Sequence, residues 1–322
     1  MRTAALILRN TGMASSRDDI RILRKFSTVY SEIYIIENRG KNAYPSKMVI
    51  KLCHTKTPSE VIAEFDALSR FNAKFDDGRI GVPKPLSVDP SSKAIVMEYA
   101  DGISLKKLLL HLRSTRRGMA LRVVELAAIA LARFHRMSTE MIDKDLSVNS
   151  PFLANNLDLT RIEPLIDSCN INLKIKSFID FSAWNILVER RSAERITLID
   201  FPDNDSICTP HIDLARFKYS LDIVGLHPQF RFLGLRWWNP DDLQDRFLAT
   251  YTNEMGVRAN DGDRMLIRWF ERQYFRKLLE VYDNGNSSIK YMLEGLYMKK
   301  SITSVLKNES EEVNTDESPA GD

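Results

Sequence analysis

The stretch that decides the fold runs from Phe178 to Phe201 and reads FIDFSAWNILVERRSAERITLIDF. Asp180 stands five positions before Asn185, and an apolar run of three residues follows that asparagine directly. After a charged turn, a second apolar run ends at Asp200. Two short apolar runs joined by a polar turn predict a β-hairpin that starts after Asn185 and ends before Asp200.

This order of polar residues suits phosphoryl transfer. In that reaction one carboxylate accepts the proton of the attacking hydroxyl, while an amide and a second carboxylate hold the metal ions that neutralise the nucleotide phosphates. Asp180, Asn185 and Asp200 stand in that order. Asp and Asn before apolar runs are also ordinary turn residues, so the spacing alone leaves both interpretations open. The choice depends on what lies upstream.

Upstream, an alternating stretch and the apolar run 48–52 predict a second hairpin, and Lys51 lies near the end of that run. Residues 59–71 predict a helix capped by Ser59, with apolar residues along one face. Glu64 is turned away from the most apolar stripe, so it is placed to reach Lys51 across the sheet. The alternative for Lys51 is a strand-end lysine in water.

The rest of the chain predicts a sheet-rich part followed by a helical part. Residues 1–24 read as a short strand or loop, then a polar helical turn from Ser15 to Arg24, and residues 94–99 read as a strand. The helical part is predicted to contain helices at residues 104–112, 119–137, 262–282 and 288–306. Residues 308–322 contain almost no apolar side chains and are expected to be disordered.

Together these residues resemble the aminoglycoside phosphotransferase and choline kinase-like family of the protein-kinase-like superfamily. The resemblance covers residues 26 to 216, about three fifths of the 322 residues, and consists of short motifs in the family's order. They are Val49-Ile50-Lys51, 64–68, 82–85, 96–102, 131–135, Asp180 to Asn185, 198–201 and 211–215. The resemblance implies an α+β, bilobal fold with a small antiparallel-sheet N-lobe at 26–100, a larger helical C-lobe at 101–307 and an N-terminal extension at 1–25.

The resemblance also implies a function: an ATP- and Mg²⁺-dependent kinase that transfers the γ-phosphoryl group to a hydroxyl of a small molecule, such as a sugar, an amino alcohol or a lipid-linked glycan. It makes Asp180 the catalytic base, with Asn185 and Asp200 as the metal ligands. It places Lys51 on the nucleotide phosphates, oriented by Glu64. The implied nucleotide-binding positions also include the hinge backbone of Glu98, Tyr99 and Ala100 and the hydroxyls of Ser27 and Thr28. Asp213 is expected to brace the catalytic loop.

Two departures from the family pattern favour a second hypothesis. Phe178 and Ile179 stand where the family has His-Gly, and the phosphate-covering loop from Ser27 to Tyr30 has no glycine, so its backbone approaches phosphates less freely. The alternative is therefore a catalytically weak, nucleotide-binding pseudokinase or scaffold. A protein Ser/Thr kinase is less well supported, because no Ala-Pro-Glu segment follows Asp200.

Composition fits a globular chain in a reducing compartment. Hydrophobic residues make up 44% of the sequence, enough to bury a sizeable core. The three cysteines, Cys53, Cys169 and Cys208, follow no metal-ligand spacing, and their odd number argues against a disulfide framework. The apolar run of five residues before Arg9 is too short for a membrane-spanning helix. We therefore expect a cytoplasmic protein.

The charge is unevenly distributed along the chain. The last fourteen residues hold six acidic side chains and no lysine or arginine, so a formal net charge of +3 leaves the body at +9. A basic body favours anionic partners, but no aromatic-basic RNA-binding signature occurs, and we expect no nucleic-acid partner. The aromatic and basic stretch from Phe230 to Trp238 is read either as helix-packing aromatics or as a peripheral contact with an anionic membrane or lipid-linked acceptor.

The body charge generates a prediction about the acceptor. A body at +9 repels a polycationic acceptor, so we expect kanamycin-like aminoglycosides not to be phosphorylated, whereas neutral or anionic hydroxyl compounds remain eligible. The measurement is magnesium-dependent ADP release with each compound present. Efficient turnover of kanamycin would contradict the charge argument.

Overall fold

The structure is a computed structural model, and it describes residues 2–13, 20–28, 30–39, 45–75, 77–111, 117–139, 165–171, 173–176, 180–190, 192–200, 207–227, 238–283 and 303. The chain divides into two compact units. The first contains residues 1–105 and 184–206, and the second contains residues 106–183 and 207–322. Within the described ranges, no helix combines the length and the apolar character that crossing a membrane requires.

The first unit is built on a five-stranded antiparallel sheet with the order β1-β2-β3-β6-β5. Its strands are β1 (Ile20–Ser27), β2 (Ser31–Asn38), β3 (Lys47–Cys53), β5 (Pro85–Asp89) and β6 (Ala94–Glu98). Side chains alternate between the two faces of a strand. Met48 and Ile50 are therefore buried on one face of β3, and Lys51 points to the other face, where it meets α2 (Pro58–Phe75).

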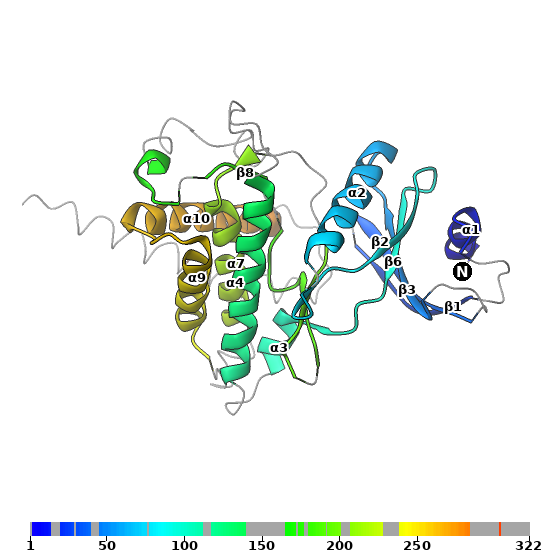
Figure 1. The fold of residues 1–322 in the computed structure, drawn as a ribbon, viewed down its shortest axis with the longest axis horizontal. Helices are drawn as coiled ribbons and strands as arrows, with labels where there is room; N and C mark the ends of the chain where they lie inside the picture. Colours follow the sequence, from blue (N-terminus) through cyan, green and yellow to red (C-terminus); the bar gives the residue numbers. More distant parts are fainter. Residues whose placement is uncertain are drawn as a thin grey trace, which may run out of the picture. The chain divides into compact units, whose positions relative to one another are not determined.

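The amino-terminal segment forms helix α1 (Arg2–Asn10) and strand β1, so the expected strand or loop followed by a polar helical turn is wrong. Ala4, Ile7 and Leu8 of α1 are buried against the sheet, on the face opposite α2 (Figure 1). The helix ends at Asn10, two residues before Gly12, whose φ of 70° lies in the left-handed region, and the Met13 N–H donates to the Leu8 carbonyl at 2.8 Å. This glycine-based C-cap stops the helix. Residues 2–10 and 20–25 are thus part of the first unit.

The sequence placed the cap of helix α2 at Ser59, and the structure places it two residues earlier. Thr57 Oγ1 accepts the N–H of Glu60 at 3.3 Å, and the Glu60 carboxylate accepts the N–H of Thr57 at 2.6 Å. This reciprocal pair is a capping box, and it satisfies two donors at the helix start. The cap therefore lies at Thr57, because Glu60 stands three residues after it.

The hairpin expected between Asn185 and Asp200 is confirmed. β9 (Ile186–Val188) pairs antiparallel with β10 (Ile196–Leu198). β9 also pairs with β7 (Ile103–Ser104), and β10 pairs with β4 (Ile80–Gly81), giving a four-stranded sheet in the order β4-β10-β9-β7. The hairpin thereby belongs to the first unit, whereas the sequence placed it in a C-lobe at 101–307.

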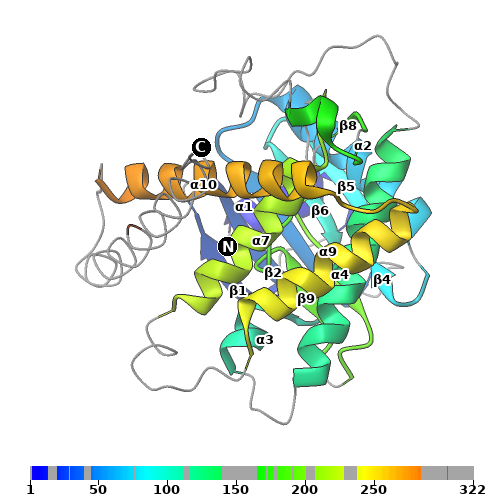
Figure 2. The ribbon, with the colours of Figure 1, turned by 90° about the vertical axis from the view of Figure 1, so that its left-hand side faces the viewer.

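The second unit is helical. It contains α4 (Arg117–Thr139), α7 (His211–Gly225), α9 (Pro240–Met255) and α10 (Asp261–Asp283), together with most of α3 (Leu105–His111) and the two-stranded pair of β8 (Ile175–Lys176) and β11 (Ile207–Cys208). Helix α9 packs along α4, and α10 lies across α7 (Figure 2). Of the helices expected here, 288–306 lies outside the described residues apart from residue 303, and the 308–322 tail lies outside them entirely.

Two leucines of α1 test its packing on the sheet. Leu8 is fully buried, and Leu6 on the opposite side is 56% exposed. We expect Leu8→Ala to lower the free energy of unfolding by about 2–5 kcal/mol, because it leaves a cavity in the core. Leu6→Ala is the matched control and should change it by less than about 0.5 kcal/mol. Urea titration of both variants measures the difference, and equal effects would show that α1 does not pack as described.

Candidate active site

Lys51 and Glu64 form the ion pair that the sequence predicted. Lys51 Nζ donates to Glu64 Oε1 at 2.7 Å, and it also contacts Oδ1 of Asp200. The Lys51 side chain is only 13% exposed. Burial alone would lower the pKa of Lys51, but the two carboxylates outweigh burial and hold this pKa above its ordinary value. The ammonium is therefore charged at any physiological pH.

Glu64 has a second cationic partner, which the sequence analysis missed. Its other oxygen, Oε2, accepts a hydrogen bond from Lys56 Nζ at 2.7 Å. Glu64 is buried on α2, so two lysines compensate a carboxylate that has little access to water. Only Lys51 of the two also reaches Asp200 in the contacts of the described residues. A lysine in the strand-to-helix connection gave no sequence signal beyond its charge.

Asp200 and Asn185 lie at the same end of the β9–β10 hairpin. The Ile199 N–H donates to the Asn185 carbonyl at 2.9 Å, which closes that end. Asp200 has a φ of 63°, in the left-handed region that few residues other than glycine adopt. Its side chain is 47% exposed. A carboxylate and an amide oxygen are ligands of the hard kind that Mg²⁺ prefers, so this pair suits a magnesium ion.

In the loop that the resemblance places over the phosphates, the Thr28 hydroxyl ties together Thr28, Tyr30 and Ser31. Thr28 Oγ1 accepts the N–H groups of Tyr30 and Ser31 at 3.2 and 2.9 Å. The same hydroxyl donates to the Ser31 carbonyl at 3.1 Å. Ser27, the last residue of β1, is exposed. The Thr28 hydroxyl is thus used inside the loop, and only a rearrangement of the turn would direct it at a phosphate.

In the predicted hinge, two of the three backbone N–H groups already donate hydrogen bonds. The Glu98 N–H donates to the Lys84 carbonyl at 2.9 Å, and the Tyr99 N–H donates to the Lys47 carbonyl at 3.4 Å. Within the described part of the chain, the Ala100 N–H makes no hydrogen bond. Of the three hinge residues named from the sequence, Ala100 therefore offers the open backbone donor that a flat purine ring needs.

Asp180 lies in the second unit, and helix α7 contacts Asp180 and two of the residues that follow it. Arg216 donates two hydrogen bonds to its carboxylate. The next residue, Phe181, is buried and packs against Phe217 at 5.5 Å between ring centroids. The Ala183 N–H donates to Ser220 Oγ at 3.0 Å. Phe178 and Ile179 lie outside the described residues.

Asp213 is buried at the start of α7, where the sequence predicted a brace for the catalytic loop. It accepts a hydrogen bond from His135 Nε2 of α4 at 3.0 Å, and His135 Nδ1 contacts the Tyr251 hydroxyl of α9 at 2.7 Å. This polar chain joins three helices. The described contacts therefore give Asp213 a role in packing the helices, and its contact with the catalytic loop stays a prediction.

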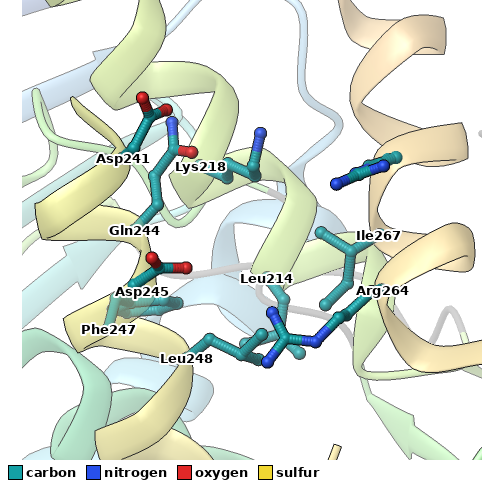
Figure 3. A pocket seen from close by; sticks show the side chains of 10 residues that line it. Leu214, Lys218, Asp241, Gln244, Asp245, Phe247, Leu248, Arg264 and Ile267 are labelled. Carbon is teal, nitrogen blue, oxygen red and sulfur yellow. The ribbon is translucent and has the colours of Figure 1, made fainter. Parts of the chain in front are cut away.

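A pocket of about 250 Å³ opens among α7, α9 and α10, with carboxylates of α9 facing guanidinium groups of α10 (Figure 3). It is lined by Leu214, Lys218, Asp241, Gln244, Asp245, Phe247, Leu248, Arg264, Ile267 and Arg268. Leu214 and Lys218 lie on one face of α7, whereas Arg216, which contacts Asp180, lies on the opposite face. An acceptor hydroxyl bound in this pocket would not meet Asp180.

Trp238 was part of the proposed membrane patch, but it is buried. Its exposed fraction is 4%, and its indole N–H donates to the Leu109 carbonyl at 3.2 Å. A tryptophan in this state cannot insert into a membrane surface. Residues 230–237, the rest of that stretch, lie outside the described residues.

Comparison with known proteins identifies the fold. No protein-family model matches the chain, and no curated protein matches it by sequence. Solved structures do match. An aminoglycoside-3'-phosphotransferase of type VIII is similar with a TM-score of 0.51 and 16% identity, over 83% of this chain and 97% of that one. Choline kinase from Cryptosporidium parvum is similar with a TM-score of 0.52 and 11% identity, over 99% and 98%.

A glucosamine kinase in complex with glucosamine, ADP and inorganic phosphate is also similar, with a TM-score of 0.54 and 15% identity over 91% of this chain and 83% of that one. At such identities the likeness shows the fold and not the activity. The expected α+β class and the resemblance read from the sequence motifs are confirmed at that level. The chain has the protein-kinase-like fold found in small-molecule phosphotransferases and kinases.

Proposed function

We propose that this chain is an ATP- and Mg²⁺-dependent kinase that transfers the γ-phosphoryl group to a hydroxyl of a small molecule. The observation that carries the proposal is the Glu64–Lys51–Asp200 chain of charges. In phosphoryl transfer by this fold, a strand lysine fixed by a helix glutamate contacts the phosphates, and an aspartate after a hairpin holds the metal. Both pairs are assembled in the first unit.

The remaining roles follow from chemistry. Asn185 and Asp200 would hold the magnesium ion, which neutralises charge on the phosphates when bound. The Ala100 N–H would donate a hydrogen bond to the adenine ring. Asp180 would accept the proton of the acceptor hydroxyl, and the phosphoryl group would move directly from ATP to that oxygen. The acceptor classes that we propose are a neutral or anionic sugar, an amino alcohol or a lipid-linked glycan.

A second candidate is a nucleotide-binding pseudokinase. The observation that favours it is the phosphate-covering turn, in which the N–H groups of Tyr30 and Ser31 already bond to Thr28. Backbone donors that are committed within the turn do not reach a phosphate. A pseudokinase would bind ATP but release no ADP, which separates it from an enzyme in the experiments below.

Two lysines that share Glu64 test the nucleotide site. Lys51→Met removes the cation that also contacts Asp200, and we expect the affinity for Mg-ATP to fall about 10- to 100-fold, the size of one charge-assisted hydrogen bond. Lys56→Met is the matched control, because it removes the other partner of Glu64; we expect a change within about threefold. Titration calorimetry measures both, and thermal unfolding without nucleotide checks folding. Equal losses would refute the assignment of Lys51.

Substitutions of two carboxylates test whether Asp180 acts as the base and Asp200 as a metal ligand. Asp180→Asn keeps the shape and removes the proton acceptor, so we expect turnover to fall about 10² to 10⁴-fold while ATP binding survives. Asp200→Asn removes charge from a metal ligand, so it should weaken ATP binding in the presence of magnesium. Steady-state ADP release and calorimetry measure the two effects. Turnover at the wild-type rate in Asp180→Asn would show that Asp180 is not the base.

A further inference from the structure

We propose that Arg216 is a positioning residue that sets the orientation of the Asp180 carboxylate, an inference that rests on the kinase function proposed above. Nε and Nη2 of Arg216 both donate to the same oxygen, Oδ1 of Asp180, at 2.9 and 2.5 Å. A rigid fork of two donors fixes an oxygen in direction as well as distance, which a lysine ammonium does not do. Because a carboxylate is planar, the position of Oδ1 also restricts that of Oδ2.

The guanidinium is itself fixed by two aromatic rings. Its central carbon lies 5.3 Å from the ring centroid of Tyr219 on α7 and 5.1 Å from that of Tyr274 on α10. The two tyrosine rings lie 5.5 Å apart, and Phe275 packs edge-on against Tyr219. Cations are attracted to the faces of such rings. Arg216 therefore has little freedom to leave Asp180.

The charge of Arg216 is constant over the working range of pH. Its side chain is 20% exposed, and burial alone would lower the pKa of the guanidinium. The carboxylate of Asp180 and the neighbouring Tyr274 outweigh burial and raise this pKa. Arg216 therefore keeps its proton and its charge in the folded unit.

Separate contacts support the carboxylate of Asp180 and the backbone that follows it. Phe181 packs on Phe217, and Ala183 bonds to Ser220, so the backbone after Asp180 is anchored on α7. Arg216 fixes the carboxylate from the same helix. A general base must meet the reacting proton in a narrow geometry, and a misplacement of about 1 Å costs on the order of 10²-fold in rate. A freely rotating Asp180 would be such a misplaced base.

Two substitutions separate the fork from the charge. Arg216→Met keeps an unbranched stem beside the tyrosine rings and removes both donors, and Arg216→Lys keeps the charge without the fork. The assay is magnesium-dependent ADP release with water as the acceptor. We expect kcat to fall about 10- to 100-fold in Arg216→Met and about 3- to 10-fold in Arg216→Lys, with the KM for ATP changed less than about threefold in either.

The chain offers a matched control for losing a forked arginine–carboxylate pair. Nε and Nη2 of Arg246 both contact Oε1 of Glu125, in the same unit and at the surface. Arg246→Met should leave kcat unchanged. Thermal unfolding of each variant reports folding, and if Arg216→Met fails to fold, Arg216→Lys carries the comparison with its own expected loss.

A double-mutant cycle decides whether Arg216 acts through Asp180. In the Asp180→Asn background, either Arg216 substitution should lower kcat by no more than about twofold, because residues that act as a unit are not additive. A purely structural role would lower kcat by the same factor in both backgrounds. That result, or wild-type kcat in Arg216→Met, overturns the inference alone. A wild-type chain that releases no ADP overturns the kinase function itself, so the two failures are distinguishable.

Discussion

The first unit depends on one buried cation, the ammonium of Lys51, and on the two carboxylates that compensate it. A buried charge that loses its partner destabilises a protein by about 3–5 kcal/mol, so Lys51, Glu64 and Asp200 must come together when this unit folds. They can do so only if β3 presents Lys51 on the face of the sheet that meets α2. The hairpin β9–β10 must also deliver Asp200 beyond its last strand. One cluster of charges therefore depends on the strand register, on the position of the helix start and on the left-handed backbone of Asp200.

In the second unit, helix α7 has the corresponding role. Arg216, Phe217 and Ser220 contact Asp180, Phe181 and Ala183 by a forked ion pair, a ring contact and a backbone hydrogen bond. The three α7 residues lie on neighbouring positions of one helix face. Phe178 stands where the family that the sequence resembles has histidine, and Arg216 of α7 contacts the Asp180 side chain in the described part of this chain. One helix thereby holds the whole segment from residue 180 to 183.

Much of this arrangement could be predicted from the sequence. The two hairpins carry strong signals, since short apolar runs alternate with polar turns. The pairing of Lys51 with Glu64 followed from the helical position of Glu64 relative to its apolar stripe, and the distance of 2.7 Å confirms it. The fold class rested on several short motifs in one order, and the similar solved structures confirm that class. The roles of these residues in binding and catalysis stay predictions.

Other features could not be predicted, for identifiable physical reasons. The apolar run of α1 is too short to separate helix from strand by period, and its deciding cue was the cap at Gly12. Strand β1 has a weak pattern because Leu23 and Phe26 are exposed among basic side chains. The partner of Arg216 lies 36 positions upstream in the chain. No local pattern couples two residues so far apart, and an arginine on a helix is ordinarily a surface residue.

The central claim is that the Glu64–Lys51–Asp200 cluster binds a nucleotide together with magnesium, and thermal unfolding with ATP tests it most directly. A ligand that binds only the folded state raises the unfolding temperature by an amount that grows with its concentration relative to Kd. The account predicts that ATP raises the unfolding temperature and that magnesium enlarges this shift. An unfolding temperature that ATP leaves unchanged, both with and without magnesium, would contradict the account.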